Sequence, residues 1–264
     1  MSQTISAERR DAPRLVASRA APTRSDGRHV TLHLLGEPEV RWGTRRSAPW
    51  PYAKLPAILM VLGCNGRSPL RREWLAALLW PEGDTASLRR ALFELRRHLR
   101  EVDSPLPLFV THRRDLALSA HVQTDLDLID RAYRGTTAGA DFDVELATQA
   151  LQLWRGELGQ GMSLAHAEDF DLWLAQMRAR WQHRALAVAD HLAEHHRRRG
   201  DAHAALAVAR IAVERAAQIG SVRAHGRLQI AHVRGVQRVG FVVGKASVWL
   251  EIKRNHVARQ WAAA

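Results

Sequence analysis

The stretch SLRRALFELRRHLR, Ser87 to Arg100, has five arginines and four leucines among fourteen residues. At about 100° per residue, its apolar side chains would share one face of a helix. These are Leu88, Ala91, Leu92, Leu95 and Leu99. The opposite side would carry Arg89, Phe93, Arg96, Arg97 and Arg100. The segment therefore predicts an amphipathic helix with one face for a protein core and one strongly cationic face.

Three interpretations fit such a helix: a solvated surface helix, a strand of a coiled coil, and a helix that binds a polyanion. The coiled coil is the weakest, because the leucine spacing lasts only about two heptads and a stable seam needs about three or four. A solvated face usually mixes charges of both signs, whereas only Glu94 and Glu101 interrupt these arginines. Guanidinium groups match phosphates and guanine edges. The helix favours a nucleic acid, with the solvated surface as the alternative.

The composition of the whole chain also favours a polyanionic partner. Its 264 residues include 39 Lys and Arg against 27 Asp and Glu, a formal net charge of +12. Such a charge attracts nucleic acid or an anionic membrane surface. The length, with 46% hydrophobic residues, suits two small domains. Because no run of about 18 apolar residues exists, we expect no membrane span. We also expect a cytoplasmic, nucleoid-associated protein.

The first 28 residues contain six arginines among Ser, Ala and Thr, without an apolar segment. They predict a disordered basic lead, residues 1–28, and not a secretory signal. A single cysteine, Cys64, lies in the apolar run AILMVLGC. We expect it to be a small buried side chain in a reducing compartment, and one cysteine cannot form a disulfide within the chain.

Residues 29–121 predict a winged helix. HVTLHLLGEPEVRWG alternates and turns as short strands do, and LPAILMVLGCNG and LRREWLAALLW have the patterns of two helices that precede the arginine helix. PLFVTHRRDLALSA then reads as two strands joined by a tight turn at Arg113–Asp115. This order of sheet, three helices and basic hairpin places one helix for the major groove beside a wing for the backbone or the minor groove.

Residues 122–217 are helical and alanine-rich in pattern. We expect an interhelix loop at RGTTAGAD (134–141), one long helix before Gly200-Asp201, and a further amphipathic helix packed back on it. Such pairs predict a tetratricopeptide-like domain, which usually holds another protein. The fold class is mainly α with a small β component. Tryptophans lie on helical apolar stripes and should be core residues; they are Trp74, Trp80, Trp154, Trp173 and Trp181.

Several segments resemble the Streptomyces antibiotic regulatory protein type of regulator, in which a response-regulator-like winged helix precedes a bacterial transcriptional activator domain. They are HLLGEPEV, LRREWLAALLWPEGDTASLRRALFELRRHLRE, HVQTDLDLIDRA and LQLWRGELGQG, and the resemblance spans about residues 31–217. It implies a DNA-binding regulator that sits on repeated promoter sites, often as a dimer, and helps recruit RNA polymerase. The recognition helix of the family maps onto Thr85 to Arg100, and its wing onto Phe109 to Leu118.

Two features depart from that family. Its wing commonly ends in Gly-Tyr-x-Leu, whereas this chain has Asp115-Leu116-Ala117-Leu118. After Ala217 the continuing helix pairs are missing, and residues 218–264 hold one acidic residue, Glu251, against eight Lys or Arg. An altered or truncated reading frame is one hypothesis for this atypical basic tail, and a genuine small β-hairpin is the other.

Two motifs suggest enzymatic chemistry, but other features of the sequence argue against each of them. His191-Leu-Ala-Glu194-His195 fits the H-x-x-E-H pattern of zinc proteases. However, cations gather in the last turn of helices before a glycine, and the neighbouring arginines would repel Zn²⁺. GFVVGKA (240–246) is too short for a phosphate loop and lacks its hydroxyl residue. We therefore expect no enzyme activity, cofactor or metal.

The sequence thus predicts an activator of transcription that binds specific double-stranded DNA, with RNA polymerase and a second copy as further partners. We expect Arg89, Arg96 and Arg100 nearest the groove, and Phe93 on a thymine methyl. Phosphate contacts are expected from Arg90, Arg97, His112, Arg113 and Arg114. Thr85 and Ser87 would add contacts at the helix N-terminus. The alternatives are a helical-repeat interaction module with a scaffold winged helix and, less favoured, the zinc protease.

Overall fold

A four-stranded sheet opens the computed structural model, which describes residues 30–83, 85–100, 107–137, 142–218, 226–233, 236–243 and 246–252. Strands β1 (Val30–His33), β2 (Glu39–Trp42) and β3 (Arg45–Arg46) are antiparallel neighbours, and β7 (Val122–Thr124) pairs with β1 in parallel. The strands read from the sequence are confirmed, and Val30, Leu32 and Val40 are buried, but the alternation ends at His33, which is buried as well. The expected basic lead lies outside the described residues.

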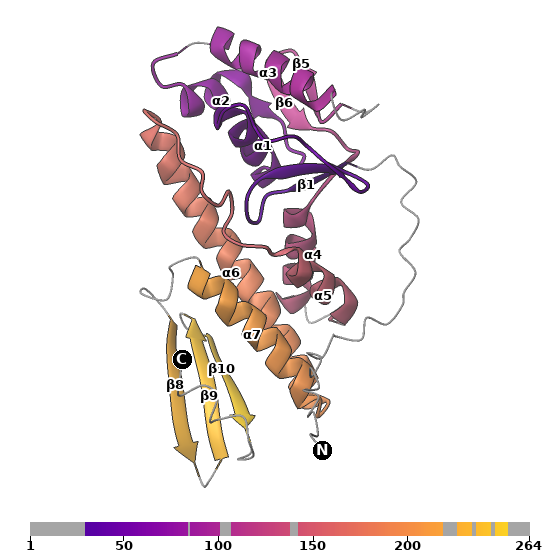
Figure 1. Ribbon diagram of the computed structural model, residues 1–264, viewed down its shortest axis with the longest axis vertical. Helices are drawn as coiled ribbons and strands as arrows, with labels where there is room; N and C mark the ends of the chain where they lie inside the picture. The colour runs from indigo at the N-terminus through magenta and orange to yellow at the C-terminus, as the bar shows by residue number, and fades with distance from the viewer. Residues whose placement is uncertain are drawn as a thin grey trace, which may run out of the picture.

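The winged helix follows in the order that the sequence predicts. Helices α1 (Lys54–Cys64), α2 (Arg72–Leu79) and α3 (Thr85–Arg100) precede the hairpin of β5 (Phe109–His112) and β6 (Asp115–Leu118). A short strand, β4 (Leu70–Arg71), precedes α2 and pairs with β6, so that the second sheet has the order β4-β6-β5. This helical and β arrangement lies in the upper part of Figure 1.

Helices α4 (Asp125–Thr137), α5 (Val144–Leu153), α6 (Glu168–Arg198) and α7 (Ala202–Gln218) form the second part. The 31-residue α6 contacts the other three and also reaches α2, so it runs along much of the molecule (Figure 1). The fold is therefore mainly α with a small β component, a winged helix followed by a helical region. Within the described residues, none of the helices combines the length and apolar composition that a membrane-spanning segment needs.

The loop expected at residues 134–141 begins later than the sequence suggests. α4 continues to Thr137 because its last turn has its own side-chain bonds. The hydroxyls of Thr136 and Thr137 donate to the carbonyls of Tyr133 and Arg134, at 2.7 and 3.1 Å. Residues 138–141 of the expected loop lie outside the described residues.

The described residues of the tail form strands β8 (Gly226–Val233), β9 (Val236–Val243) and β10 (Ala246–Ile252). They form an antiparallel sheet in which β9 is central. This arrangement matches the β alternative for the tail and adds one strand to the expected hairpin.

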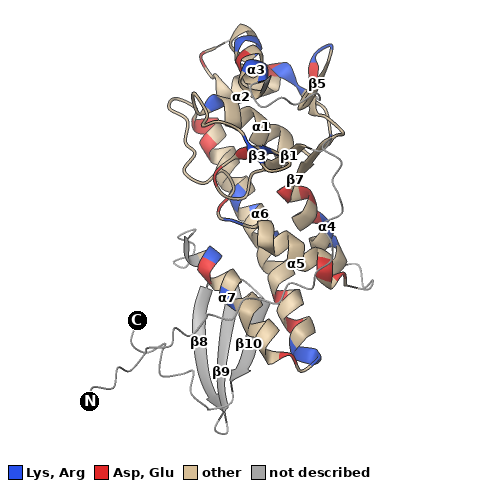
Figure 2. Ribbon diagram, turned by 45° about the vertical axis from the view of Figure 1, so that its right-hand side comes forward, with Lys and Arg blue, Asp and Glu red and all other residues tan. Residues whose placement is uncertain are grey.

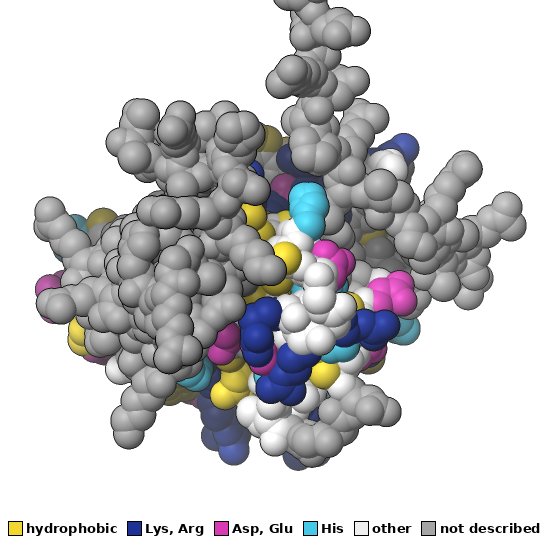
Figure 3. All heavy atoms as spheres, turned by 90° about the horizontal axis from the view of Figure 1, so that it is seen from below, with side chains coloured by type: hydrophobic (Ala, Val, Ile, Leu, Met, Phe, Trp, Pro, Cys, Tyr) yellow, Lys and Arg dark blue, Asp and Glu magenta, His cyan; other side chains and the backbone are white. Residues whose placement is uncertain are grey.

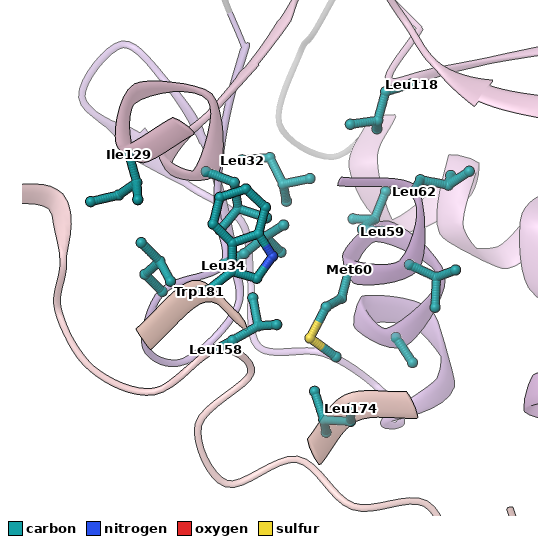
Figure 4. Close-up of a cluster of buried hydrophobic side chains, with 14 of the residues drawn as sticks. Leu32, Leu34, Leu59, Met60, Leu62, Leu118, Ile129, Leu158, Leu174 and Trp181 are labelled. Atoms are coloured by element: carbon teal, nitrogen blue, oxygen red, sulfur yellow. The ribbon is translucent and has the colours of Figure 1, made fainter. Parts of the chain in front are cut away.

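The described hydrophobic core is continuous between the winged helix and the helical region. In Figure 4, side chains of β1, α1 and β6 lie near those of α4, α6 and the loop before α6. The labelled residues are Leu32, Leu34, Leu59, Met60, Leu62, Leu118, Ile129, Leu158, Leu174 and Trp181. Cys64 is half-buried beside this core, and burial raises the pKa of its thiol to about 12.

Trp74 is a wrong core prediction. Trp154 and Trp181 are buried, and Trp80 and Trp173 are half-buried, but the side chain of Trp74 is 44% exposed. The short helix α2 buries Leu75, Ala76, Leu78 and Leu79. Trp74 lies roughly a third of a turn from the centre of that face, so it points away from the core.

Asp125 joins the two parts of the molecule. It is the first residue of α4, its side chain is fully buried, and its Oδ2 accepts the amide hydrogens of Leu34 and Leu35 at 2.8 and 2.7 Å. These amides follow β1, so the carboxyl group ties α4 to the first sheet. Burial raises the pKa of Asp125 to about 7, although the two amides oppose that shift.

His33, at the end of β1, has charged side chains around it. Arg155, in the loop after α5, forms an ion pair with Glu39 at 3.2 Å and donates to the carbonyl of Glu37 at 3.0 Å. Glu39 also pairs with Arg41, and it lies opposite His33 in the β1–β2 register. Burial, assisted by the guanidinium charges of Arg155 and Arg41, lowers the pKa of His33 to about 4.

Removing the Asp125 carboxyl should destabilise the protein strongly. Asp125→Ala leaves two buried amides without an acceptor, and each costs about 1 to 3 kcal/mol. Asp125→Asn keeps an oxygen for both amides and should cost less. Urea unfolding of the full chain measures both, with the exposed Glu82→Ala as a control. Equal stability of the alanine and wild-type proteins would contradict the role of Asp125.

The stability that His33 contributes should depend on pH. Because its pKa is lowered in the fold, the unfolded chain binds the proton first, and stability is lost as pH falls from about 6.5 to 4. The raised pKa of Asp125 acts oppositely, with stability lost as pH rises from about 4 to 7.

Wild type should therefore lose about 2 kcal/mol relative to His33→Gln between pH 7 and pH 5. Urea unfolding at the two pH values tests this, with the exposed His121→Gln as the matched variant. The same difference between wild type and His33→Gln at both pH values would argue against a neutral buried His33.

Candidate nucleic-acid interface

The two faces of α3 are as the sequence predicts. Its leucines are 0 to 6% exposed and pack against α1 and α2; they are Leu88, Leu92, Leu95 and Leu99. The outer face holds exposed Arg89, Arg90, Phe93, Arg96 and Arg97. In Figure 2, the ribbon is coloured for Lys and Arg at several positions of α3 and at the tip of the neighbouring β5–β6 hairpin. The backbone of Arg100 ends the helix, and its side chain lies outside the described residues.

The N-terminal turn of α3 can accept an anion. Thr85 is exposed at the first position of the helix, and Ser87, two residues later, is half-buried. The first turn contains no acidic residue. Since the first amides of a helix lack carbonyl partners within it, this end carries a partial positive charge that favours phosphate.

The tip of the wing is a tight two-residue turn with exposed cations. Arg113 adopts a φ of 48°, a left-handed conformation that lets the strands reverse within two residues. The side chains of His112, Arg113 and Arg114 are all exposed. The Arg114 carbonyl accepts the amide hydrogen of Arg72 at 2.8 Å, which fixes the turn to the start of α2.

β4 brings another arginine to the wing. Arg71 pairs with Asp115 across the β4–β6 register, with its Nε 3.5 Å from the carboxylate. It is exposed, and it offsets the acidic residue of the hairpin. Arg71 is not among the site residues predicted from the sequence, because a two-residue strand has no readable period and its partner Asp115 is more than forty residues further along the chain.

Arg96 lies against the wing. Its Nη2 donates to the Thr111 hydroxyl at 3.3 Å, and its guanidinium carbon is 4.7 Å from the centre of the Phe109 ring. Phe109 is only 5% exposed, so the guanidinium covers a ring that belongs to the core. The cationic helix and the cationic hairpin are therefore neighbours in contact.

The exposed cations of α3 and the hairpin tip are available to an external anion. Within the described part of the chain, Arg89, Arg90, Arg97, Arg113 and Arg114 form no ion pair.

The acidic residue of α3, Glu94, is engaged by Tyr52 at the side of the helix. Burial, together with the hydrogen bond to Glu94, raises the pKa of the Tyr52 hydroxyl. The carboxylate therefore already has a partner beside the cationic face.

In the H-x-x-E-H segment, Glu194 and His191 contact neighbouring side chains. Glu194 accepts hydrogen bonds from Arg197 and Arg198 at 2.6 to 2.7 Å, and these bonds lower its pKa to about 2. The His191 ring lies 4.8 Å from that of Phe142. No group of metal-ligating side chains able to hold an ion occurs among the described residues.

The lower face, near the end of α6, mixes basic, acidic and histidine side chains (Figure 3). Such a mixture differs from the one-sign face of α3. The loop-like segment GFVVGKA includes Gly244 and Lys245, which lie outside the described residues.

Comparisons with known proteins support the fold. No family model and no curated protein matches the chain. A solved structure, EmbR of Mycobacterium tuberculosis in complex with a low-affinity phosphopeptide, is similar with a TM-score of 0.51 and 21% identity. The match covers 68% of this chain and 48% of that chain, so this chain matches about half the length of EmbR. The chain thus shares with EmbR the architecture of a winged helix followed by a helical region.

Two adjacent residues of α3 should differ sharply in their effect on stability. Leu92 is 1% exposed and Phe93 is 61% exposed. Leu92→Ala should lower the free energy of unfolding by about 2 to 5 kcal/mol, because it leaves a cavity in the core. Phe93→Ala should change it by less than about 0.5 kcal/mol. Urea unfolding tests the pair; equal losses would mean that Phe93 is not available to a ligand.

Proposed function

We propose that the protein is a transcription regulator, an activator, that binds specific sequences of double-stranded DNA. This proposal rests on the position of α3 beside the β5–β6 hairpin. Both expose arginines that form no ion pair with any described residue, and the two surfaces are neighbours. Winged helices place such a helix in the major groove and the hairpin on the adjacent backbone or minor groove. The fold shared with EmbR and the resemblance to antibiotic regulatory proteins both agree with this function.

Base edges and phosphates are assigned to different parts of this surface. Arg89 and Arg100 would reach guanine edges, and Phe93, at 61% exposure, would contact a thymine methyl. Phosphates would be held by Arg90, Arg97, His112, Arg113 and Arg114, with Thr85 and Ser87 at the helix N-terminus. Arg71 extends this set because β4 places it beside the tip of the wing, opposite Asp115.

The helical region is assigned to protein partners. Residues 122–217 would act as the tetratricopeptide-like domain and residues 29–121 as the DNA-binding domain. RNA polymerase is the proposed partner for activation, and a second copy would occupy a neighbouring repeat of the site. The protein would act in the cytoplasm at the nucleoid, as a regulator and not as an enzyme. Two arginines donate to Glu194 of the alternative protease motif, which argues against the zinc protease.

DNA binding and its chemistry can be measured together. Duplexes selected from random oligonucleotides by the full chain should share a sequence and outcompete scrambled duplexes in gel shifts. The slope of log K against log salt is negative. Arg97→Ala and Arg113→Ala should each reduce its magnitude by about one unit, because each removes one phosphate contact.

Arg131→Ala is the matched control, since Arg131 is exposed on α4, away from α3 and the hairpin. It should bind with the wild-type affinity and slope. No selected sequence, or wild-type slopes in both interface variants, would refute the proposal. Binding to a protein partner in the absence of any DNA binding would favour the helical-repeat interaction module instead.

A further inference from the structure

We infer that Arg96 is a positioning residue that holds the wing at a fixed distance from α3, rather than a side chain that reads a base. This inference rests on the proposed DNA-binding function and adds a role that charge alone does not give. Sequence reasoning groups Arg96 with Arg89 and Arg100 as base readers, because all three share one side of the helix. The contacts of Arg96 distinguish it from Arg89.

The Arg96 guanidinium makes two contacts with the wing. Its central carbon lies over the Phe109 ring, 4.7 Å from the ring centre, and its Nη2 donates a hydrogen bond to the Thr111 hydroxyl at 3.3 Å. Both partners belong to β5. A base edge in the major groove requires the same planar edge, directed away from the protein. Reaching a base would therefore require Arg96 to give up the hydrogen bond and the ring contact.

β5 depends on this contact more than β6 does. In the sheet order β4-β6-β5, β6 has a strand on each side and also contacts α1, whereas β5 pairs only with β6 in the described part of the chain. Val110, Thr111 and His112 are exposed, so only Phe109 anchors β5 in the core. Arg96 therefore links the less supported strand of the wing to the recognition helix.

A fixed wing improves DNA binding by preorganisation. Arg113 and Arg114 follow β5 directly, so movement of β5 moves both cations relative to α3. When helix and hairpin form one unit, phosphate contacts by the wing accompany groove binding without a further ordering cost. Losing the Arg96 contact should thus remove several wing contacts together, while the base contacts of α3 remain.

The test compares Arg96→Lys and Thr111→Val with Arg113→Ala in the full chain. Lysine keeps the charge of Arg96 but not its planar stacking or fork. Thr111→Val removes the acceptor without changing any charge. We expect Arg96→Lys to weaken binding about tenfold and to lower the salt slope by about two units, because the contacts of Arg113 and Arg114 are lost together.

Thr111→Val should also reduce the magnitude of the salt slope. A substitution that changes no charge could not do so if Thr111 did not help to position the wing. The bases chosen in random-oligonucleotide selection should be those of wild type for both variants. Combining Arg96→Lys with Arg113→Ala should lower affinity by less than the product of the separate effects. In the free protein, amide hydrogen exchange in β5 should become faster in Arg96→Lys, a readout that does not depend on DNA.

The opposite results are distinct. A changed preference at one base position, with an unchanged salt slope, in Arg96→Lys would overturn the positioning role and make Arg96 a base reader. Unchanged β5 exchange and wild-type binding in Arg96→Lys would also overturn it. Failure of the wild-type chain to select any DNA would instead refute the proposed function.

Discussion

Burial of the leucine face of α3 is the constraint on which the rest of this surface depends. Leu88, Leu92, Leu95 and Leu99 pack on α1 and α2, and this packing fixes the rotation of the helix about its axis. Because side chains on a helix are locked in register, the arginines then face outward without any interaction of their own to place them. The hydrophobic effect therefore aims the cationic face, and removal of apolar surface from water supplies the free energy for it.

Strand pairing, the hydrogen bonds of Asp125 and apolar packing join the winged helix to the helical region. β7 returns to pair with β1, α4 begins at the next residue, and the buried Asp125 receives two amides from the end of β1. Apolar side chains of α6 continue the core beneath the first sheet. The two backbone amides offset part of the cost of burying this carboxyl group, because both donate to its Oδ2. Because the packing is continuous, α6 supports the winged helix directly.

Local patterns predicted most elements because each follows from a short period in the sequence. The leucine spacing of α3 and the hairpin around Arg113 needed no knowledge of distant residues. The errors have a common cause. Trp74 is exposed because other residues of the short helix α2 occupy its buried face. Helix α4 extends into the expected loop because the hydroxyls of Thr136 and Thr137 bond to carbonyls of the same helix. Competition for space and partners is invisible in a single segment.

Periodicity and residue type were enough to predict the order of the three helices and the wing, the sign of the surface charge, and the face of α3 that carries it. Three contacts could be seen only in the folded chain: Arg71 with the wing, Arg96 with Phe109, and Asp125 with two backbone amides. The physical reason is that each is a contact between residues distant in the chain. Their proximity is set by how sheets and helices pack, which no local pattern encodes.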